Sequence, residues 1–264
     1  MTMNMIYLTL LSPLHTGGTT QEGNLLGIAR ESHTNLPYIP SSTIRGRLRA
    51  NVLDQEKKFA LFGNEIADGV QLEQGSIWIG DGSLLWIPVS SLSHGVVWIT
   101  CPLLLKRWIR ASGQKVSSVP SEYSTSLGTD KPIYLKDAIL RDGLKPWEGW
   151  KDFVKDPNIE RVIVLPDQHC ATLIQMSLWR QVKVKLDEHK VVDGGFRYEE
   201  AIPPDSLMYF TWGVTAKANG TSKKALSDFQ ELLTPDHVMQ IGGQESLGRG
   251  FVQIFSDKKD PEIS

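Results

Sequence analysis

The chain has 264 residues, of which 41% are hydrophobic, and its formal net charge at pH 7 is -2. This length and apolar content suffice for one large domain, or for a core domain with an insertion, and they exclude a disordered or fibrous class. The nearly balanced charge argues against a protein that coats nucleic acid with its whole surface, so an RNA site must be a local group of basic residues.

The chain has only two cysteines, Cys101 and Cys170. Two widely spaced thiols form neither a disulfide framework nor a zinc-ligand set, so we expect a reducing cytoplasm and no metal or other cofactor. No apolar run approaches the roughly 20 residues that span a bilayer, and the first residues lack the layout of a signal peptide. These features predict a soluble cytoplasmic protein.

Residues 5–11 alternate apolar side chains with others, which predicts a first core strand buried on one side. The side chains expected to face the core are Ile6, Leu8 and Leu10. His15 follows this strand, just before the glycine pair 17–18, where it can position a phosphate or act in acid–base chemistry near neutral pH. A local hydrogen-bonding role for His15 is the alternative.

Residues 41–52 predict a helix that carries hydroxyl groups at its start. Ser41 or Ser42 is expected to cap a helix that begins near Thr43, and this end would attract phosphate. Three arginines border its apolar stripe, and guanidinium groups can hold a phosphate backbone with paired hydrogen bonds. They are Arg45, Arg47 and Arg49. The alternative is the solvated charged face of an ordinary amphipathic helix.

The next elements are shorter. Residues 59–63 indicate a packed helix end closed by glycine. Residues 75–89 alternate on both sides of a Gly-Asp-Gly segment, which predicts a strand hairpin. A strand over residues 96–100 and a helix from Pro102 to about Arg110 follow.

Residues 111–165 lack sustained periodicity until a short strand at 162–165, which predicts an irregular insertion. Residues 182–186 then alternate apolar and basic side chains, and the glycine pair 194–195 is expected to form the turn of a hairpin with one basic face. By itself this pattern is typical of a soluble edge strand.

A strand over residues 207–214, a helix over 222–233 and a last strand over 251–255 complete the chain. Together with the first strand and helix, they predict an α+β fold with an interrupted ferredoxin-like (RRM-like) core of β-α-β-β-α-β order. The glycines of residues 242–250 resemble a phosphate loop in spacing, but arginine and glycine follow instead of lysine and a hydroxyl residue, so a nucleotide triphosphatase is not indicated. The alternative to a phosphate-binding loop here is a tight turn before the last strand.

The chain resembles the RAMP (repeat-associated mysterious protein) superfamily of CRISPR systems. The segments that carry this resemblance are residues 12–18, the pair Arg30-Glu31, residues 36–49 and residues 242–250. Two further segments resemble the repeated backbone subunit of the type III-B (Cmr) effector complex. They are residues 88–92 followed by 97–102, and residues 198–204.

The resemblance implies a single RAMP domain over residues 1–264 with a thumb hairpin at 182–204 that wedges against guide RNA. Its implied partners are CRISPR guide RNA, target RNA, copies of itself and other subunits of a type III effector complex. The RNA-binding residues that pattern and resemblance together suggest are His15, Gly17, Gly18, Arg30, Ser41, Ser42, Arg45, Arg47, Arg49, Lys183, Lys185, Tyr198, Gly248 and Arg249.

One departure from the family concerns cleavage. Members that cut target RNA carry an aspartate six residues before the glutamate of the arginine-glutamate pair. Here that glutamate is Glu31, so the corresponding position is Leu25. Leucine can neither bind a metal nor orient a 2′-hydroxyl, so we expect a subunit that binds target RNA without cutting it. Glu22 could replace the acid if the loop is shifted, and His15 is the other catalytic candidate. The remaining alternatives are a target-RNA endoribonuclease and a free-standing ribonuclease that processes the guide with His15 or His33.

Overall fold

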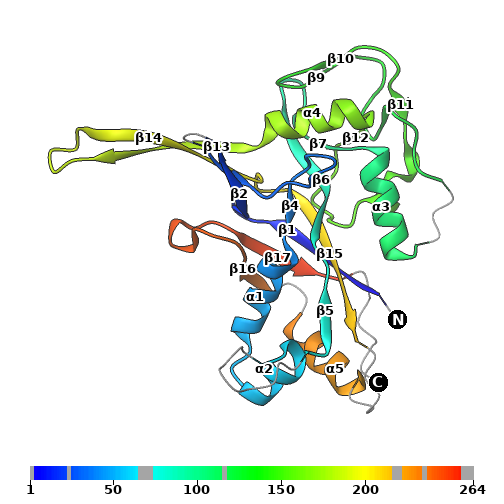
Figure 1. The fold of residues 1–264 in the computed structure, drawn as a ribbon. Coiled ribbons are helices and arrows are strands. Elements are labelled where there is room, and N and C mark those ends of the chain that lie inside the picture. The colour runs from blue at the N-terminus through cyan, green and yellow to red at the C-terminus, as the bar shows by residue number, and fades with distance from the viewer. Residues whose placement is uncertain are drawn as a thin grey trace.

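The computed structural model describes residues 3–22, 25–64, 74–114, 118–215, 222–233 and 237–256. Within this part of the chain, an 11-stranded mixed sheet lies at the centre of the molecule (Figure 1). Its strands follow the order β11-β8-β12-β7-β6-β15-β1-β17-β16, and β4 and β5 pair with β6 and β15. Their bounds are β1 Asn4–Leu10, β4 Tyr38–Ile39, β5 Ile77–Ile79, β6 Gly82–Ser91, β7 Gly95–Thr100, β8 Ser124–Thr125, β11 Lys145–Pro146, β12 Val162–Val164, β15 Leu207–Val214, β16 Val238–Gln240 and β17 Phe251–Phe255.

Helices pack around this sheet, so the predicted mixed α+β class is confirmed. The helices are α1 Ser41–Asn51, α2 Gln55–Phe62, α3 Pro102–Ser112, α4 Asp167–Ser177 and α5 Ser222–Leu232, with 3-10 helices η1 Glu148–Phe153 and η2 Glu245–Leu247. Among the described residues, no helix is both long and apolar enough to cross a membrane. The four central strands, β17-β1-β15-β6, are antiparallel to their neighbours, and α1 and α5 lie in the connections that follow β1 and β15.

Apolar side chains are buried on both faces of the sheet. On one face, Leu8 and Leu10 of β1 pack with residues of α1, α2 and α5. On the other face, Tyr7 is fully buried in a cluster with Trp86 and Trp108, and Trp108 Nε1 donates a 3.0 Å hydrogen bond to the Tyr7 hydroxyl. The expectation that β1 is buried on one side is therefore wrong, because α3 and η1 cover the second face.

The segment from β5 to β6 follows one neighbouring strand instead of forming the expected hairpin. Both strands pair with β15, through Ile79 opposite Trp212 and Ser83 opposite Tyr209. Gly80 lies between them and donates its N–H to the neighbouring β15 backbone over 2.7 Å. The Gly-Asp-Gly segment is therefore an interruption within one run along β15, which the alternating pattern alone does not distinguish from a turn.

Residues 111–165 are irregular in part, but they contribute to the sheet and to the core. β8, β11 and β12 extend the large sheet beyond β7, while β9 (Ile133–Tyr134) and β10 (Ile139–Leu140) pair with each other. Phe153 of η1 is buried, and its carbonyl accepts a 3.0 Å hydrogen bond from Trp86 Nε1. That these residues are an insertion into a core domain stays a prediction.

A long hairpin, β13 (Trp179–Leu186) and β14 (Val192–Ala201), extends away from the rest of the molecule (Figure 1). We call it the projecting hairpin. Its base belongs to a second sheet of order β13-β14-β3-β2, in which β3 is Leu25–Ile28 and β2 is Gly17–Glu22. The Asp187 carboxylate closes the turn by accepting 2.9 Å bonds from the N–H groups of His189 and Val191. The predicted turn at the glycine pair 194–195 is wrong, because this pair lies within β14 and a short carboxylate forms the turn instead.

Candidate nucleic-acid interface

The start of α1 lies between two cavities. The helix begins at Ser41, two residues before the predicted start, and Pro40 is its N-cap. No side chain of the helix caps it, so the predicted serine cap is wrong; the backbone N–H of Ser41 donates instead to the Asp81 carboxylate over 2.7 Å. The first turn itself contains no acidic residue, and the residues after Ser41 line the cavities on either side.

The three arginines of α1 lie in different environments. Arg45 donates hydrogen bonds to the carbonyls of Phe62 and Ile77, and Arg49 donates to those of Phe62 and Gly63. The carbonyls of Phe62 and Gly63 lie at the end of α2, where the helix itself offers them no N–H partner. Burial first, and then the charge of Arg49, lower the pKa of Arg45. Arg45 and Arg49 therefore join α1 to α2, and a role in RNA binding stays a prediction for both.

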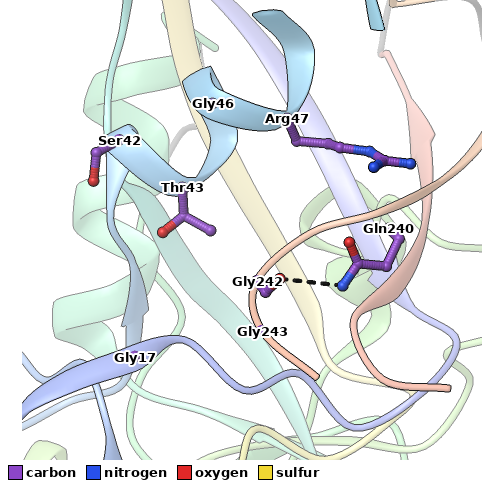
Figure 2. Close-up of a pocket in the computed structure, with 8 residues that line it drawn as sticks. All are labelled: Gly17, Ser42, Thr43, Gly46, Arg47, Gln240, Gly242 and Gly243. Atoms are coloured by element: carbon purple, nitrogen blue, oxygen red, sulfur yellow. Dashed lines mark hydrogen bonds between the residues drawn. The ribbon is translucent and has the colours of Figure 1, made fainter. Parts of the chain in front are cut away.

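Arg47 extends from α1 toward a cavity of about 380 Å³, which we call the first cavity (Figure 2). Its lining consists of Gly17, Ser42, Thr43, Gly46, Arg47, Gln240, Gly242 and Gly243. None of these lining residues, which belong to the described part of the chain, is acidic. Within the described chain, Arg47 Nε is buried without a hydrogen-bond partner. In the described part of the structure, the first cavity therefore combines a cation without a protein partner with the hydroxyl residues Ser42 and Thr43 and with glycine backbone.

Two glycines of the first cavity are not explained by packing. A Cβ atom at Gly17 or Gly46 would meet nothing within 4 Å. At Gly242, by contrast, φ is +81° and a Cβ atom would come within 2.5 Å of the His15 carbonyl oxygen. The open space at Gly17 and Gly46 lets another molecule approach the backbone closely.

The 242–250 loop is a tight turn fixed to the end of the first strand. The Gln240 side-chain amide donates to the carbonyls of Gly242 and Arg249, each over 3.2 Å. Gly243 donates its N–H to the His15 carbonyl over 3.0 Å, and Gly248 ends η2 in the left-handed region at φ +73°. These bonds agree with the alternative that we gave for this loop, and contacts with phosphate stay a prediction.

Arg249 does not line the first cavity but packs against the projecting hairpin. Its guanidinium lies over the Trp179 ring, 4.3 Å from the centroid, and Nη2 donates to Gln181 Oε1 over 2.6 Å. The same Nη2 is 3.8 Å from the carboxylate of Glu199. Arg249 is only 4% exposed. Through these contacts it joins the last loop to the base of the hairpin.

Glu199 is fully buried at this base, with Lys183 Nζ at 2.6 Å and Arg197 Nη2 at 3.3 Å from its oxygens. Burial raises the pKa of Glu199, but the adjacent Lys183 ammonium, the Gln244 side chain and the charge of Arg197 outweigh it and lower the pKa overall. The charge of Lys183 is therefore already paired within the protein. Sequence reasoning missed Glu199, because nothing in the pattern distinguishes a buried glutamate from an exposed one on an edge strand.

The outer part of the projecting hairpin is exposed. Lys185 pairs with Asp193 over 3.1 Å, and the Tyr198 ring meets Phe196 edge to face with centroids 5.5 Å apart. Lys185 is near the tip of the hairpin, whereas Tyr198 is near its base, where it pairs with Leu25 of β3, and neither residue lines the first cavity. Their role in RNA binding stays a prediction.

A larger cavity of about 860 Å³ lies on the other side of the α1 start, and we call it the second cavity. Gly17, Ser42 and Thr43 line both cavities, so they form a shared wall. The further lining residues are Leu25, Gly27, Ile28, Ala29, Arg30, Glu31, Ser32, Asn35, Tyr38, Pro40, Gln175, Arg180 and Glu200.

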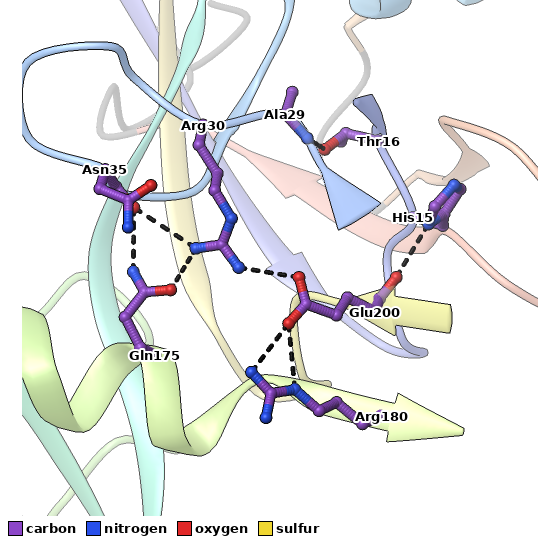
Figure 3. A network of polar contacts seen from close by, with 8 residues as sticks. All are labelled: His15, Thr16, Ala29, Arg30, Asn35, Gln175, Arg180 and Glu200. Atoms are coloured by element: carbon purple, nitrogen blue, oxygen red, sulfur yellow. Dashed lines mark hydrogen bonds and ion pairs between the residues drawn. The ribbon is translucent and has the colours of Figure 1, made fainter. Parts of the chain in front are cut away.

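Glu200 organises the charged wall of the second cavity (Figure 3). Its side chain is 2% exposed and accepts hydrogen bonds of 2.8 Å from Arg30 Nη2 and 3.0 Å from Arg180 Nε. Arg180 Nη2 forms an ion pair with the same carboxylate at 2.9 Å. Arg30 also donates to the Gln175 side chain and to the Asn35 carbonyl. Sequence reasoning found Arg30 but missed Glu200, Arg180 and Gln175, since only the fold brings these residues together.

His15 is held by the same residue. It is 4% exposed, and its Nδ1 lies 2.8 Å from the Glu200 carbonyl oxygen. Because a carbonyl can only accept, Nδ1 carries a proton and Nε2 is the acceptor of the neutral ring. This contact agrees with a local hydrogen-bonding role, and a catalytic role for His15 stays a prediction.

Leu25 is in β3, where it pairs with Tyr198 of β14 and with Glu22 of β2, and it lines the second cavity. An apolar side chain therefore stands in the wall that carries Arg30 and Glu200. The surroundings of Gly18 and the side chain of Glu22 lie outside the described part of the structure, so the proposed replacement of the acid by Glu22 stays a prediction.

Comparisons with known proteins agree on one family. The family model described as the RAMP superfamily matches residues 7–253. The CRISPR system Cmr endoribonuclease Cmr4 of Pyrococcus furiosus is 27% identical over 279 residues, which cover 95% of this chain and 94% of that protein.

Solved structures of similar fold cover almost the whole chain. The crystal structure of oligomeric Cmr4 from Pyrococcus furiosus matches with a TM-score of 0.72 and 23% identity, over 98% of this chain and 100% of that one. A chain in the type III-B Cmr-beta complex bound to cognate target RNA matches with a TM-score of 0.76 and 19% identity, over 96% of each chain. At these identities the structural matches establish similarity of fold.

Proposed function

The chain belongs to the RAMP superfamily, and from this premise we propose that it is the backbone subunit of a type III-B CRISPR effector complex. In this role it binds guide RNA, forms a row of copies along the guide and presents it to target RNA. The sequence similarity to Cmr4 over 95% of the chain supports the assignment. The order β17-β1-β15-β6, with α1 and α5 in the connections, supports an interrupted ferredoxin-like core.

The observation that carries the proposal is the first cavity. Among the residues that the structure describes, it joins an unpaired arginine nitrogen, hydroxyl residues at a helix start and glycine backbone, and its described lining contains no acidic residue. These are the groups that bind a phosphate backbone without reading its sequence. We propose that Arg47, Ser42 and Gly17 contact guide phosphates, and that Arg45 and Arg49 act mainly by holding α1 to α2.

The partners and location follow from the same role. The related Cmr4 of Pyrococcus furiosus is described as oligomeric, and a related chain is part of a complex with cognate target RNA. We therefore propose that copies of this chain associate with one another, with guide and target RNA and with other effector subunits, in the cytoplasm. A free-standing guide-processing nuclease is less favoured, because one ring nitrogen of each candidate histidine already contacts a protein group. Nδ1 of His15 lies against the Glu200 carbonyl, and Nε2 of His33 accepts a 3.0 Å bond from Arg107.

Gly46 offers a test that separates binding from folding. Replacing a helical glycine by alanine should stabilise the protein by about 1 kcal/mol, since a Cβ atom at Gly46 meets no atom of the protein. If guide RNA approaches the backbone here, Gly46→Ala should raise the melting temperature and yet weaken guide binding several-fold. Both quantities are measured on the purified chain, by thermal unfolding and by titration of labelled guide RNA.

The matched control is Ala50→Gly, an exposed position on the same helix that lines neither cavity. It should lower the melting temperature by a similar amount and leave guide affinity unchanged. Unchanged guide affinity in Gly46→Ala would show that RNA does not approach this face of α1.

A further inference from the structure

The described ion pairs around the second cavity leave one positive charge without a carboxylate partner. Arg30 and Arg180 share the single carboxylate of Glu200. The other acidic lining residue, Glu31, is bound through both oxygens by Arg107, over 2.8 and 2.9 Å. Among the described side chains, the guanidinium groups of Arg30, Arg180 and Arg107, the last of them behind the lining, therefore pair with two carboxylates, which leaves one positive charge for a ligand.

This charge is accessible at Arg180. Its side chain is 58% exposed, although Nε and Nη2 are both directed to Glu200. Figure 3 shows the third guanidinium nitrogen, Nη1, pointing away from the carboxylate, and within the described residues it has no protein acceptor. Glu200 is buried, so it fixes the orientation of both arginines while leaving donors of Arg180 for an anion.

We infer that the second cavity binds a phosphate group of target RNA through Arg180 and Arg30, with Glu200 as the positioning residue. This inference rests on the proposed function, in which the first cavity holds the guide. The two cavities share the wall of Gly17, Ser42 and Thr43, so strands in both lie side by side, as paired strands must. Leu25 belongs to this site too: a carboxylate there would cancel the free charge, so leucine favours retention of the phosphate.

The test uses the full chain loaded with guide RNA and a labelled complementary RNA, titrated at several salt concentrations. Arg180→Ala should lower target affinity about tenfold and reduce the salt slope by about 1, while guide affinity stays unchanged. Arg141→Ala, which removes an exposed arginine that is not among the lining residues, is the matched control and should change neither.

Glu200→Gln distinguishes positioning from charge alone. Removing a negative charge should tighten RNA binding if only net charge matters, whereas loss of the fixed arginines should weaken it. Leu25→Asp should weaken target binding, and the neutral isostere Leu25→Asn should not. Because Arg180 is exposed, its variant stays informative if Glu200→Gln fails to fold.

Three results distinguish a failure of the phosphate-site inference from a failure of the proposed function. If Arg180→Ala binds target with the affinity and salt slope of Arg141→Ala, the phosphate site is wrong although the subunit function stands. If guide affinity falls as much as target affinity, the phosphate belongs to the guide and the target assignment is wrong. If the unmodified chain binds no guide, the proposed function itself fails.

Discussion

Target RNA paired with guide on this chain is expected to remain intact. RNA cleavage needs a group that aligns or activates the 2′-hydroxyl and in-line placement of the leaving oxygen. At the position where the cleaving members that this sequence resembles carry aspartate, Leu25 lines the second cavity. His15 cannot supply both functions, because its Nδ1 is bound to the Glu200 carbonyl.

Leu25→Asp is the substitution expected to create cleavage. One correctly placed acid–base group contributes about 10²–10⁴-fold, so the variant should cut at least about 100 times faster than the unmodified chain. The rate is measured on labelled target at saturating concentration, since the added charge weakens binding. Leu25→Asn, which has similar shape but no basic carboxylate, should remain inactive. Regularly spaced cuts by the unmodified chain that disappear in Glu22→Ala would contradict this prediction, because Glu22 would then be the missing acid.

Shortening the projecting hairpin is expected to abolish multi-copy assembly on guide RNA without unfolding the monomer. Apolar side chains along the hairpin are 41–61% exposed, which is typical of a surface that another molecule covers. They are Val182, Val184, Leu186, Val191, Val192, Phe196 and Tyr198. Since these side chains are not buried in the core, removing the outer hairpin should change the melting temperature little.

The variant replaces residues 185–195 by Asn-Gly, so that a two-residue turn joins the paired residues Val184 and Phe196. Native mass spectrometry on guide RNA should show single copies where the unmodified chain shows several. The control replaces only the exposed Lys190 by Gly, which keeps the turn at φ +61° and should leave assembly intact. Loss of the folded monomer, or assembly equal to that of the unmodified chain, would contradict the prediction.

The sequence predicted the fold best where the apolar residues form a continuous run or recur with one clear period. β15 lies at its predicted range because it is an apolar run buried on both faces, and β17, α3 and α5 lie close to theirs because their apolar side chains match the period of a strand or helix. Tyr7 was misjudged because aromatic and polar residues on the second face of β1 are covered by distant parts of the chain. The hairpin over residues 75–89 and the turn at 194–195 failed because glycine also occurs at bulges and within strands.

The candidate site could be predicted only in part. The segment around α1 was recognised, yet the three arginines have unequal roles, because the partners of Arg45 and Arg49 come from the end of α2. The charged wall of the second cavity joins Arg30, Gln175 and Glu200, which are far apart in sequence. No local pattern identifies such a contact, since it depends on how β14 and α4 pack beside β3.

The most direct test of guide binding at the first cavity is the salt dependence of guide-RNA affinity for the unmodified chain, Arg47→Ala and Arg45→Ala. Both variants remove one arginine from α1, but only Arg47 lines the first cavity. Arg47→Ala is predicted to bind guide about tenfold more weakly, with a salt slope reduced by about 1, and Arg45→Ala is predicted to melt earlier while keeping the slope. Equal slopes for all three proteins, or an equal loss in both variants, would contradict the assignment of the first cavity to guide RNA.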